Sequence, residues 1–357
     1  MIEAIAIVPT YRRPQETARC LESLLGSEFL GTEFLLETIV VDSSPDDLTW
    51  DAIKQFQSEL RLRYIKLAKQ TMPGEARNLA VEAAGNELIV SIDSDMEVLP
   101  STVWRMITYL RDHPQVARLT GLSVFSSGGR QGQIDCPGKL DRIHEAYGTA
   151  FSEGVYGRFE AFYRSAFLEL GGYDPLFIPW GEGTELSVRF WRAGLPLGFV
   201  KESVAYHNVA APFGLTRDNP EPAAARHRTL FLLACKYDLD HAAQSHHFGE
   251  ICRDWIANYG VTAIQSVIWA AKSAAWFAEN SGRLSEATGL IPQQFDFKPF
   301  DVFTERELLA ECLNQAQERI SPFHQRAFAR GLRSDDAARP APVPSGKPTA
   351  PVTVAEV

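Results

Sequence analysis

Two aspartates at the end of an apolar run are the residues best suited to chemistry in this chain. The segment 87–95 reads ELIVSIDSD, so Asp93, Ser94 and Asp95 follow a stretch typical of a buried strand. In a strand, residues two apart face the same side, about 6.5 Å from each other. Carboxylates so placed repel, and a hard divalent cation such as Mg²⁺ or Mn²⁺ relieves that repulsion through oxygen ligands. A solvated pair that caps the next helix is the alternative.

Strand and helix patterns alternate over the first 95 residues. Apolar runs typical of strands occur at 2–8, 35–42, 62–67 and 87–95, with helical spacing between them at 15–25, 50–60 and 74–84. This α/β alternation favours a parallel sheet with right-handed helical crossovers. Ligands bind such sheets at the carboxyl ends of the strands. We therefore expect loops 9–13, 42–46 and 93–95 to converge on one edge of the sheet.

The composition indicates an ordinary globular protein with a surplus of acids. Of the 357 residues, 45% are hydrophobic and 22% are charged, which excludes a fully disordered, collagen-like or coiled-coil protein. The 35 lysines and arginines stand against 45 aspartates and glutamates, for a net charge of −10. Because nonspecific nucleic-acid binding depends on neutralising phosphates with cations, we expect no nucleic-acid partner.

Cysteine spacing and hydropathy indicate the cellular compartment of the protein. The five cysteines lie far apart with no CxxC, which favours a reducing compartment over a disulfide framework. The N-terminal apolar run contains Glu3 and stops at Pro9, unlike a signal peptide. The longest other run, 261–278, is interrupted by Gln265 and Lys272 and falls short of a span of about 20 apolar residues. We expect a cytoplasmic protein without a transmembrane segment, with peripheral membrane contact left open.

Six motifs follow one another over roughly residues 3–210: PTYRRPQETARCLESLL, IVVDSSPDD, MPGEARNLAVEAAGNELIVSIDSDMEVLP, LGGYDPLF, WGEGTELSVRFWRAG and VAYH. Together they resemble family 2 nucleotide-sugar glycosyltransferases with the GT-A fold. The resemblance implies a Rossmann-like, mostly parallel sheet flanked by helices. We expect this domain at 1–215, a helical C-terminal appendage at 216–330, and a disordered tail at 331–357, where five prolines and no aromatic residue occur.

The resemblance assigns the first loop and the second strand end to the nucleotide. In that loop, Tyr11 would stack on the base and Arg12 would pair with a phosphate or a carboxylate. Asp42 matches the acid that accepts the N–H of a uracil edge, so a UDP-sugar is the expected donor, with a guanosine nucleotide left open. The family's usual second acid and glycine are replaced by Ser43 and Ser44. The residues that match the first loop are Pro9, Thr10, Tyr11 and Arg12.

Further donor residues are implied by later motifs. Gly74 and Arg77 match a GxxARN element, where the glycine lets backbone approach the ligand. Arg77 would then face the diphosphate or the metal-site acids, and an ordinary surface cation is the alternative. Asp93 and Ser94 would contact the donor. Trp180 is a candidate floor for a sugar ring or a plain core residue.

The same resemblance implies a metal site of Asp93, Asp95 and His207. Asp95 would bind Mn²⁺ or Mg²⁺ directly, and Asp93 would act through water or the ribose. His207 ends the strand of VAYH, where many related enzymes place a third ligand. A neutral imidazole can complete a site of carboxylate and phosphate oxygens. A satisfied polar residue at a strand end is the alternative for His207.

The chain departs from the family at the catalytic base. Most members carry Glu-Asp in the segment that matches 181–186, and Gly183 stands at the aspartate position here. Glu182 and Glu185 are both able to take the acceptor proton. The helix dipole should lower the pKa of Glu182, whereas Glu185 can pair with Arg189 one turn on. We take Glu182 as the base and Glu185 as the second candidate; two helix-start acids without that role are the alternative.

The hypothesis from the sequence is a metal-dependent glycosyltransferase of the hexosyltransferase type, which inverts the sugar. A retaining GT-A enzyme and a catalytically inactive nucleotide-sugar-binding protein are the alternatives. The expected acceptor is a glycan, a lipid-linked intermediate or a small molecule. The helical C-terminal region leaves open acceptor selection, a partner protein or a homodimer.

Overall fold

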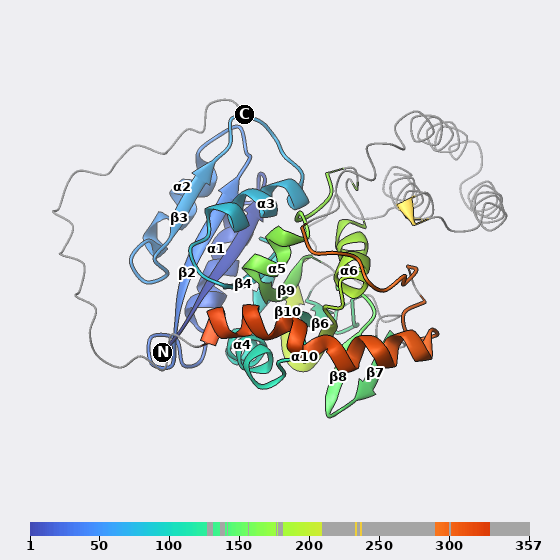
Figure 1. Ribbon diagram of the computed structural model, residues 1–357. Coiled ribbons are helices and arrows are strands. Elements are labelled where there is room, and N and C mark those ends of the chain that lie inside the picture. The colour runs from blue at the N-terminus through green and yellow to red at the C-terminus, as the bar shows by residue number, and fades with distance from the viewer. Residues whose placement is uncertain are drawn as a thin grey trace, which may run out of the picture.

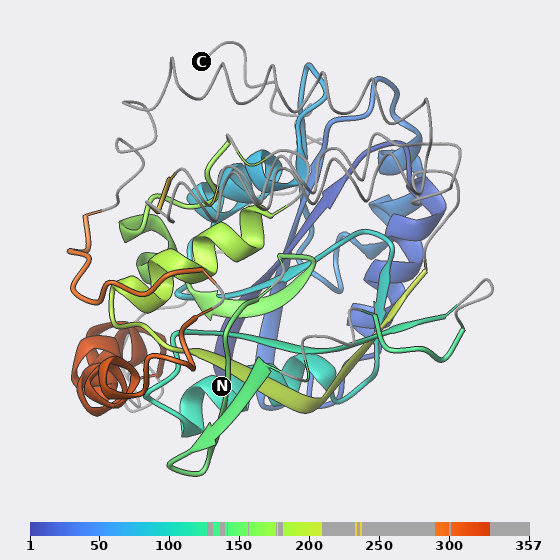
Figure 2. The same ribbon diagram turned by 90° about the vertical axis from the view of Figure 1, so that its right-hand side faces the viewer.

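A ten-stranded mixed sheet with helices packed around it forms the body of the molecule (Figures 1 and 2). The structure is a computed structural model that describes residues 1–126, 131–135, 140, 142–155, 157–175, 177, 181–208, 233, 236–237, 290–299 and 301–328. Within these residues the strand order is β3-β2-β1-β4-β9-β6-β10-β8-β7, and the short β5 pairs with β10.

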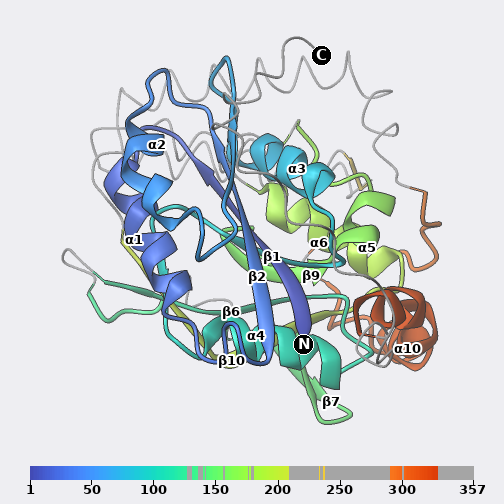
Figure 3. The ribbon, with the colours of Figure 1, turned by 90° about the vertical axis from the view of Figure 1, so that its left-hand side faces the viewer.

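The N-terminal half alternates strand and helix as the sequence predicts. Strands β1, β2, β3 and β4 pair in parallel with one another, and α1 and α2 lie on one side of β1 and β2 with α3 on the other (Figure 3). Pro14 opens α1, where its fixed backbone angle suits the first helical turn. The elements are β1 (Ile2–Thr10), α1 (Pro14–Leu25), β2 (Phe34–Asp42), α2 (Leu48–Ile53) with a 3₁₀ turn (Lys54–Phe56), β3 (Arg63–Lys66), α3 (Pro73–Ala83) and β4 (Leu88–Ile92).

Antiparallel pairs dominate the second half of the sheet. Strand β9 runs antiparallel to both of its neighbours, β4 and β6, while β6 and β10 pair in parallel. The hairpin of β7 and β8 was not predicted, because β7 is only half-buried and has no buried side chain to mark it. The elements are β5 (Met96–Val98), α4 (Thr102–Asp112), β6 (Arg118–Phe125), β7 (Ile143–Ala146), β8 (Thr149–Ser152), β9 (Phe159–Tyr163), α5 (Arg164–Glu169), α6 (Glu182–Arg192), β10 (Leu197–His207) and α10 (Arg306–Phe328).

The α/β fold class is confirmed, and the C-terminal helix α10 packs on the sheet domain. Phe297 is fully buried, and its ring lies 5.9 Å from that of Trp191 on α6. Phe303 meets the same tryptophan at 6.0 Å. Segment 290–328 therefore shares its hydrophobic core with the sheet. Most of the expected helical region before residue 290, and the tail 331–357, lie outside the described residues, so the domain boundaries stay a prediction.

No helix in the described part of the chain is both long enough and apolar enough to cross a bilayer.

Phe297→Ala should lower the free energy of unfolding by about 3–5 kcal/mol, because it leaves a cavity beside Trp191. Urea denaturation measures the change. Leu290→Ala is the matched control from the same segment. Since Leu290 is 88% exposed, that substitution should stay within about 0.5 kcal/mol. Equal stability of Phe297→Ala and wild type would show that segment 290–328 does not contribute to the core.

Candidate active site

The three loops that were expected to converge do meet at the carboxyl ends of β1, β2 and β4. Thr10 and Asp42 are paired neighbours at the ends of β1 and β2. The backbone N–H of Arg12 donates to the Ser44 hydroxyl oxygen at 2.7 Å. Arg13 reaches across to form an ion pair with Asp95. The loops of the first two strands are thereby tied to the acidic pair after the fourth.

Arg13, which the sequence analysis passed over, contacts the acidic pair in place of Arg12. The backbone of Arg12 is in the left-handed region, with φ of 53°, and its guanidinium lies 5.3 Å from the centre of the Tyr11 ring. That side chain is exposed, whereas Arg13 is half-buried. The left-handed turn separates the directions of the two arginines, a difference that the residue types alone do not reveal.

The two aspartates lie in a turn and not on one face of a strand. Strand β4 ends at Ile92, and the N–H of Met96 donates to the carbonyl of Asp93 at 3.0 Å. The expected like-facing geometry is therefore wrong. Each carboxylate has its own arginine instead: Asp93 pairs with Arg77 and Asp95 pairs with Arg13. The two cations relieve the repulsion that the sequence analysis assigned to a metal.

Asp95 nevertheless keeps one oxygen available. It is 6% exposed, and its Oδ1 is buried without a hydrogen-bond partner among the described residues. The Nε2 atom of His207 lies 3.7 Å from the other oxygen, Oδ2. Burial opposes ionisation of Asp95, but the adjacent His207 and the charge of Arg13 outweigh it and lower its pKa. An ionised, buried and unpaired carboxylate oxygen is the kind of group that a cation satisfies.

His207 is held at the end of β10 beside this oxygen. Its Nδ1 lies 2.9 Å from Oδ2 of Asp135. Burial disfavours the charged ring, but the hydrogen bond to Asp135 and the charge of Asp95 outweigh it and raise the pKa of His207 to about 9. The imidazole therefore carries charge at neutral pH in this structure.

The residues fit a divalent cation that the donor helps to bind. The described residues contain no group of three histidine, cysteine or acidic side chains arranged around one cation position. Mg²⁺ commonly binds through one or two carboxylates, with water and substrate phosphates completing the shell. Asp95 Oδ1 and His207 are suited to such a site. The protein alone supplies too few ligands for a closed site.

Asp42 is an internal anchor. It is fully buried, and its Oδ1 accepts from the N–H and the hydroxyl of Ser44, at 2.8 and 2.5 Å. Its Oδ2 accepts from Tyr64 at 2.6 Å and from Lys66 at 3.2 Å. Because a carboxylate offers about four lone-pair positions, these donors fill it. The expected direct acceptance of a uracil N–H by Asp42 does not match this arrangement.

Arg77 joins the acidic turn to the start of α6. It is 2% exposed, which excludes an ordinary surface cation. Besides its bond to Asp93, its Nη1 lies 3.7 Å from Oε1 of Glu182. The guanidinium also lies 5.6 Å from the centre of the Tyr173 ring. The candidate base, Glu182, and the donor-side acid, Asp93, therefore contact the same guanidinium, that of Arg77.

Gly74 and Asn78 allow helix α3 to pack closely against Tyr173 and Glu182. A Cβ at Gly74 would lie 3.3 Å from the Cβ of Tyr173 and 3.6 Å from the Cγ of Glu182. The glycine thus makes room for protein side chains, where the sequence analysis expected ligand. The Asn78 side chain donates to the carbonyl of Tyr173 and accepts from its N–H, both at 2.8 Å. Asn78 belongs to the GxxARN element, and this membership was the one sequence feature that could have indicated its two hydrogen bonds to Tyr173.

Glu182 is the first residue of α6, after Gly181 with φ of 89°. Its side chain is 19% exposed. Burial raises its pKa, Asp93 adds to the effect, and Arg77 opposes it. The expected lowering by the helix dipole is therefore wrong, because desolvation outweighs the dipole. A carboxylate with a raised pKa is a stronger proton acceptor once ionised.

Glu185 lies in a buried ion cluster. It bonds Arg189 through both oxygens, at 2.8 and 2.6 Å. Lys236 and the hydroxyl of Tyr237 reach the same carboxylate at 2.8 and 2.9 Å. Although burial works against ionisation, Arg189 and Lys236 lower the pKa of Glu185 to about 2. This geometry corrects its place as the second base candidate, because its lone pairs are taken and it is fully buried.

Three further sequence candidates, Pro9, Thr10 and Ser94, lie at or near this edge. Thr10 is buried, and its hydroxyl bonds that of Thr17 at 2.8 Å, while Pro9 precedes it in β1. Ser94 is buried within the acidic turn. Trp180 lies outside the described residues, so its role stays a prediction.

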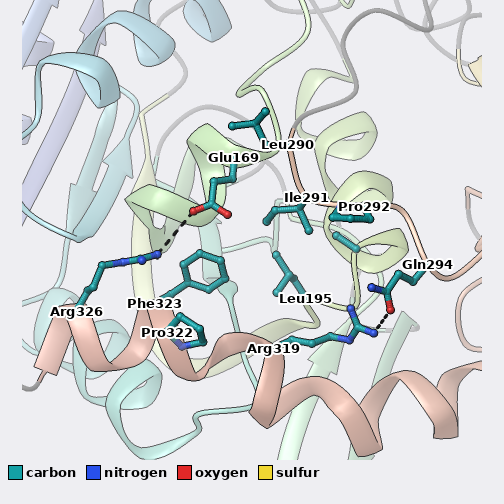
Figure 4. Close-up of a pocket in the computed structure, with 11 residues that line it drawn as sticks. Glu169, Leu195, Leu290, Ile291, Pro292, Gln294, Arg319, Pro322, Phe323 and Arg326 are labelled. Atoms are coloured by element: carbon teal, nitrogen blue, oxygen red, sulfur yellow. Dashed lines mark hydrogen bonds and ion pairs between the residues drawn. The ribbon is translucent and has the colours of Figure 1, made fainter.

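A separate cavity of about 440 Å³ lies between α10, α5 and residues 290–294 (Figure 4). Its floor is apolar, with Leu195, Ile291 and Phe323. Arg326 pairs with Glu169 across it at 3.7 Å. It contains none of the residues of the acidic edge, so this cavity is separate from the candidate site.

Glu185→Gln should lower the free energy of unfolding at neutral pH by about 3–5 kcal/mol, because it removes the carboxylate that pairs with the buried Arg189 and one of the two acids that pair with Lys236. The folded pKa of Glu185 is depressed to about 2, against about 4.3 in an unfolded chain. Its contribution is therefore complete above about pH 4.3 and is lost as the pH falls toward the folded value.

Urea denaturation across pH checks this, and the difference between wild type and Glu185→Gln should shrink on acidification. Glu37→Gln, which breaks a partly exposed pair with Arg63, is the control and should cost at most about 1 kcal/mol. A difference that is independent of pH would contradict the assignment.

Comparison with known proteins matches the N-terminal part of the chain to one family. Residues 5–167 match the model of glycosyl transferase family 2. The poly(ribitol-phosphate) beta-N-acetylglucosaminyltransferase TarS of Staphylococcus aureus is 30% identical over 114 residues, which are 32% of this chain and 20% of TarS. The succinoglycan biosynthesis protein ExoO of Rhizobium meliloti is 29% identical over 171 residues, 46% of this chain and 48% of ExoO. The matched region thus spans less than half the length of either relative.

Solved structures show the same fold. S. aureus TarS 1–349 in complex with UDP-GlcNAc superposes with a TM-score of 0.52 at 17% identity, over 94% of both chains. GalNAc-T7 with UDP, GalNAc and Mn²⁺ gives 0.53 at 15% identity, over 79% of this chain and 58% of that one. The chain has the GT-A fold, and its residues 5–167 match glycosyl transferase family 2.

Proposed function

We propose that this protein is a glycosyltransferase that moves a sugar from a UDP-sugar to an acceptor hydroxyl, with inversion and with a divalent cation. The observation that carries the proposal is the Arg77 bridge, which links Asp93 of the acidic turn to Glu182. One buried guanidinium thus spans a donor-side acid and an acid of raised pKa. The UDP-GlcNAc complex of TarS, a structural neighbour, makes UDP-GlcNAc the first donor to test.

The donor side would bind a diphosphate and its cation. Asp95, with its unpaired Oδ1, and His207 would hold Mn²⁺ or Mg²⁺, and Asp93 would act through water or the ribose. The bound cation would offset the charge that grows on the departing diphosphate. Arg13 and Arg77 surround the acids with positive charge. Each arginine can exchange a carboxylate contact for a phosphate oxygen when the donor arrives, since both anions suit its planar donors.

The acceptor side would use Glu182 as general base. Its carboxylate takes the proton of the acceptor hydroxyl while that oxygen forms a bond to the anomeric carbon and the bond to the diphosphate breaks. A base is most effective with a pKa near the working pH, and burial moves Glu182 in that direction. Arg77 supports the ionised form and holds the side chain next to the donor-side acids. Glu185 orients Arg189 of the same helix, and Arg189 holds α6 in place by donating to the backbone carbonyls of Leu170 and Gly172.

Asp95→Asn should abolish transfer and its dependence on Mn²⁺, because the buried oxygen that the cation needs is replaced by an uncharged amide. Thermal shift with UDP-GlcNAc and Mn²⁺ gives a second measurement. A donor at 100 times its Kd stabilises the wild type by about 2.7 kcal/mol, and the variant should lose that gain. Asp51→Asn, at an exposed surface pair, should behave as wild type. Full activity in EDTA would rule out the metal-dependent mechanism.

Glu182→Gln should lower kcat by about 10²–10⁴-fold while the KM for the donor stays unchanged, because proton removal is lost and donor contacts remain. In the wild type, activity should fall as the pH drops through the raised pKa of Glu182, above the range of an ordinary glutamate. Steady-state kinetics across pH measure both effects.

Glu75→Gln, an exposed acid on α3, is the control for the loss of one carboxylate and should keep its kcat. Proton NMR of the product should show an inverted anomeric centre. Retention of configuration, or a full kcat in Glu182→Gln, would exclude Glu182 as the base and favour the retaining alternative. Donor binding without transfer to any acceptor would indicate a binding protein.

A further inference from the structure

We infer that Asp135 is a positioning residue for the cation site, which fixes the His207 ring with Nε2 directed at Asp95. The inference rests on the proposed function, because it concerns the same cation. It also gives a role to residues 131–135, which the site described above leaves unexplained.

The backbone carries Asp135 back to the end of β6. The N–H of Gly132 donates to the carbonyl of Phe125 at 2.8 Å, and the N–H of Phe125 donates to Gln133 at 2.9 Å. The N–H of Asp135 donates to the carbonyl of Ser123 at 2.8 Å. Residues 131–135 thus run antiparallel to the strand end. Strand β6 in turn pairs with β10, with Phe125 opposite His207. Asp135 therefore lies beside the imidazole of His207.

Two contacts restrict the His207 ring. Oδ2 of Asp135 lies 2.9 Å from Nδ1, and the Phe125 ring stacks on the imidazole with 5.7 Å between centroids at 22°. The stacking sets the plane of the ring, and the hydrogen bond sets its rotation within that plane. With Nδ1 directed at Asp135, Nε2 faces Oδ2 of Asp95 at 3.7 Å.

Asp135 is itself buried and held. It is 7% exposed, Arg158 lies 2.5 Å from its Oδ2, and the Ser123 hydroxyl donates to the same oxygen at 3.3 Å. Arg158 also lies 3.3 Å from Nδ1 of His207. The backbone carbonyl of Arg158 accepts the N–H of Asp93 at 2.8 Å. Arg158 therefore fixes Asp135 with its side chain and the acidic turn with its backbone. These two contacts position His207 relative to Asp93 and Asp95.

The chemistry of this arrangement is that of an outer carboxylate behind a ligand histidine. An imidazole that donates Nδ1–H to a carboxylate presents the lone pair of Nε2 to a cation. Removing such a partner typically weakens metal affinity about 10- to 100-fold. A purely structural Asp135, present only as the counter-charge of Arg158, would affect folding stability and leave the affinity for Mn²⁺ unchanged.

The test is Mn²⁺ affinity of the full-length protein in the presence of saturating UDP, measured by electron paramagnetic resonance of free Mn²⁺ against a protein-free UDP blank, with Tm recorded for every variant. Asp135→Asn should bind Mn²⁺ about 10- to 100-fold more weakly than wild type. Glu153→Gln is the matched control, because Glu153 is also a buried acid paired with an arginine, Arg142. It should lose stability without any change in Mn²⁺ affinity.

A double-mutant cycle with His207→Ala shows whether Asp135 acts through the histidine. Asp135→Asn should have no further effect on Mn²⁺ affinity in that background. Wild-type affinity in Asp135→Asn, or an equal loss with and without His207, would overturn the inference. Unchanged affinity in His207→Ala, or no Mn²⁺ binding by the wild type, would instead refute the ligand set of the proposed function.

Asp135→Glu keeps the charge for Arg158 but moves the acceptor oxygen by one methylene. If Asp135→Asn does not fold, Asp135→Glu replaces it in the affinity measurement. It should also weaken Mn²⁺ binding, and full affinity would overturn the inference.

Discussion

A buried arginine between two acids is the interaction on which the candidate site depends. Arg77 is almost inaccessible to water, and an uncompensated charge there would cost several kcal/mol. Asp93 and Glu182 supply the compensation from opposite sides. Nε and Nη1 of Arg77 have no hydrogen bond among the described residues. The guanidinium is thus neutralised, yet it keeps donors for an anion, a state suited to a site that receives a diphosphate.

The surroundings of Arg77 form a second buried network that limits its movement. The Tyr173 ring lies against it, and the Tyr173 hydroxyl bonds Glu160 on β9. Glu160 pairs with Arg118 on β6 at 2.5 Å, and both are fully buried. Arg118 also reaches the carbonyl of Gly183 at 3.5 Å. Partners from two strands and α6 therefore support one tyrosine, and a fully satisfied polar network of this kind specifies a single arrangement.

Two glutamates three residues apart on α6 show how environment separates similar side chains. Glu182 at the first position has one distant cation, and burial raises its pKa. Glu185, almost one turn further, bonds Arg189 and Lys236, and its pKa is about 2. Pairs of acids with opposite pKa shifts are common where one acts on a proton and the other maintains structure. Both come from the sequence EGTE, which does not indicate which residue takes which role.

By itself, the sequence determined the α/β class, the parallel order of the first four strands and the convergence of their loops, because these follow from hydrophobic periodicity and from the handedness of crossovers. Motif order was sufficient to predict the family and to select Arg77, Asp95 and His207. The tertiary structure alone decided the contacts among side chains: the turn that parts Asp93 from Asp95, the saturation of Asp42, and Asp135 beside His207. Those contacts join residues far apart in the chain, and desolvation and the direction of each side chain are properties of the packed fold that no local pattern encodes.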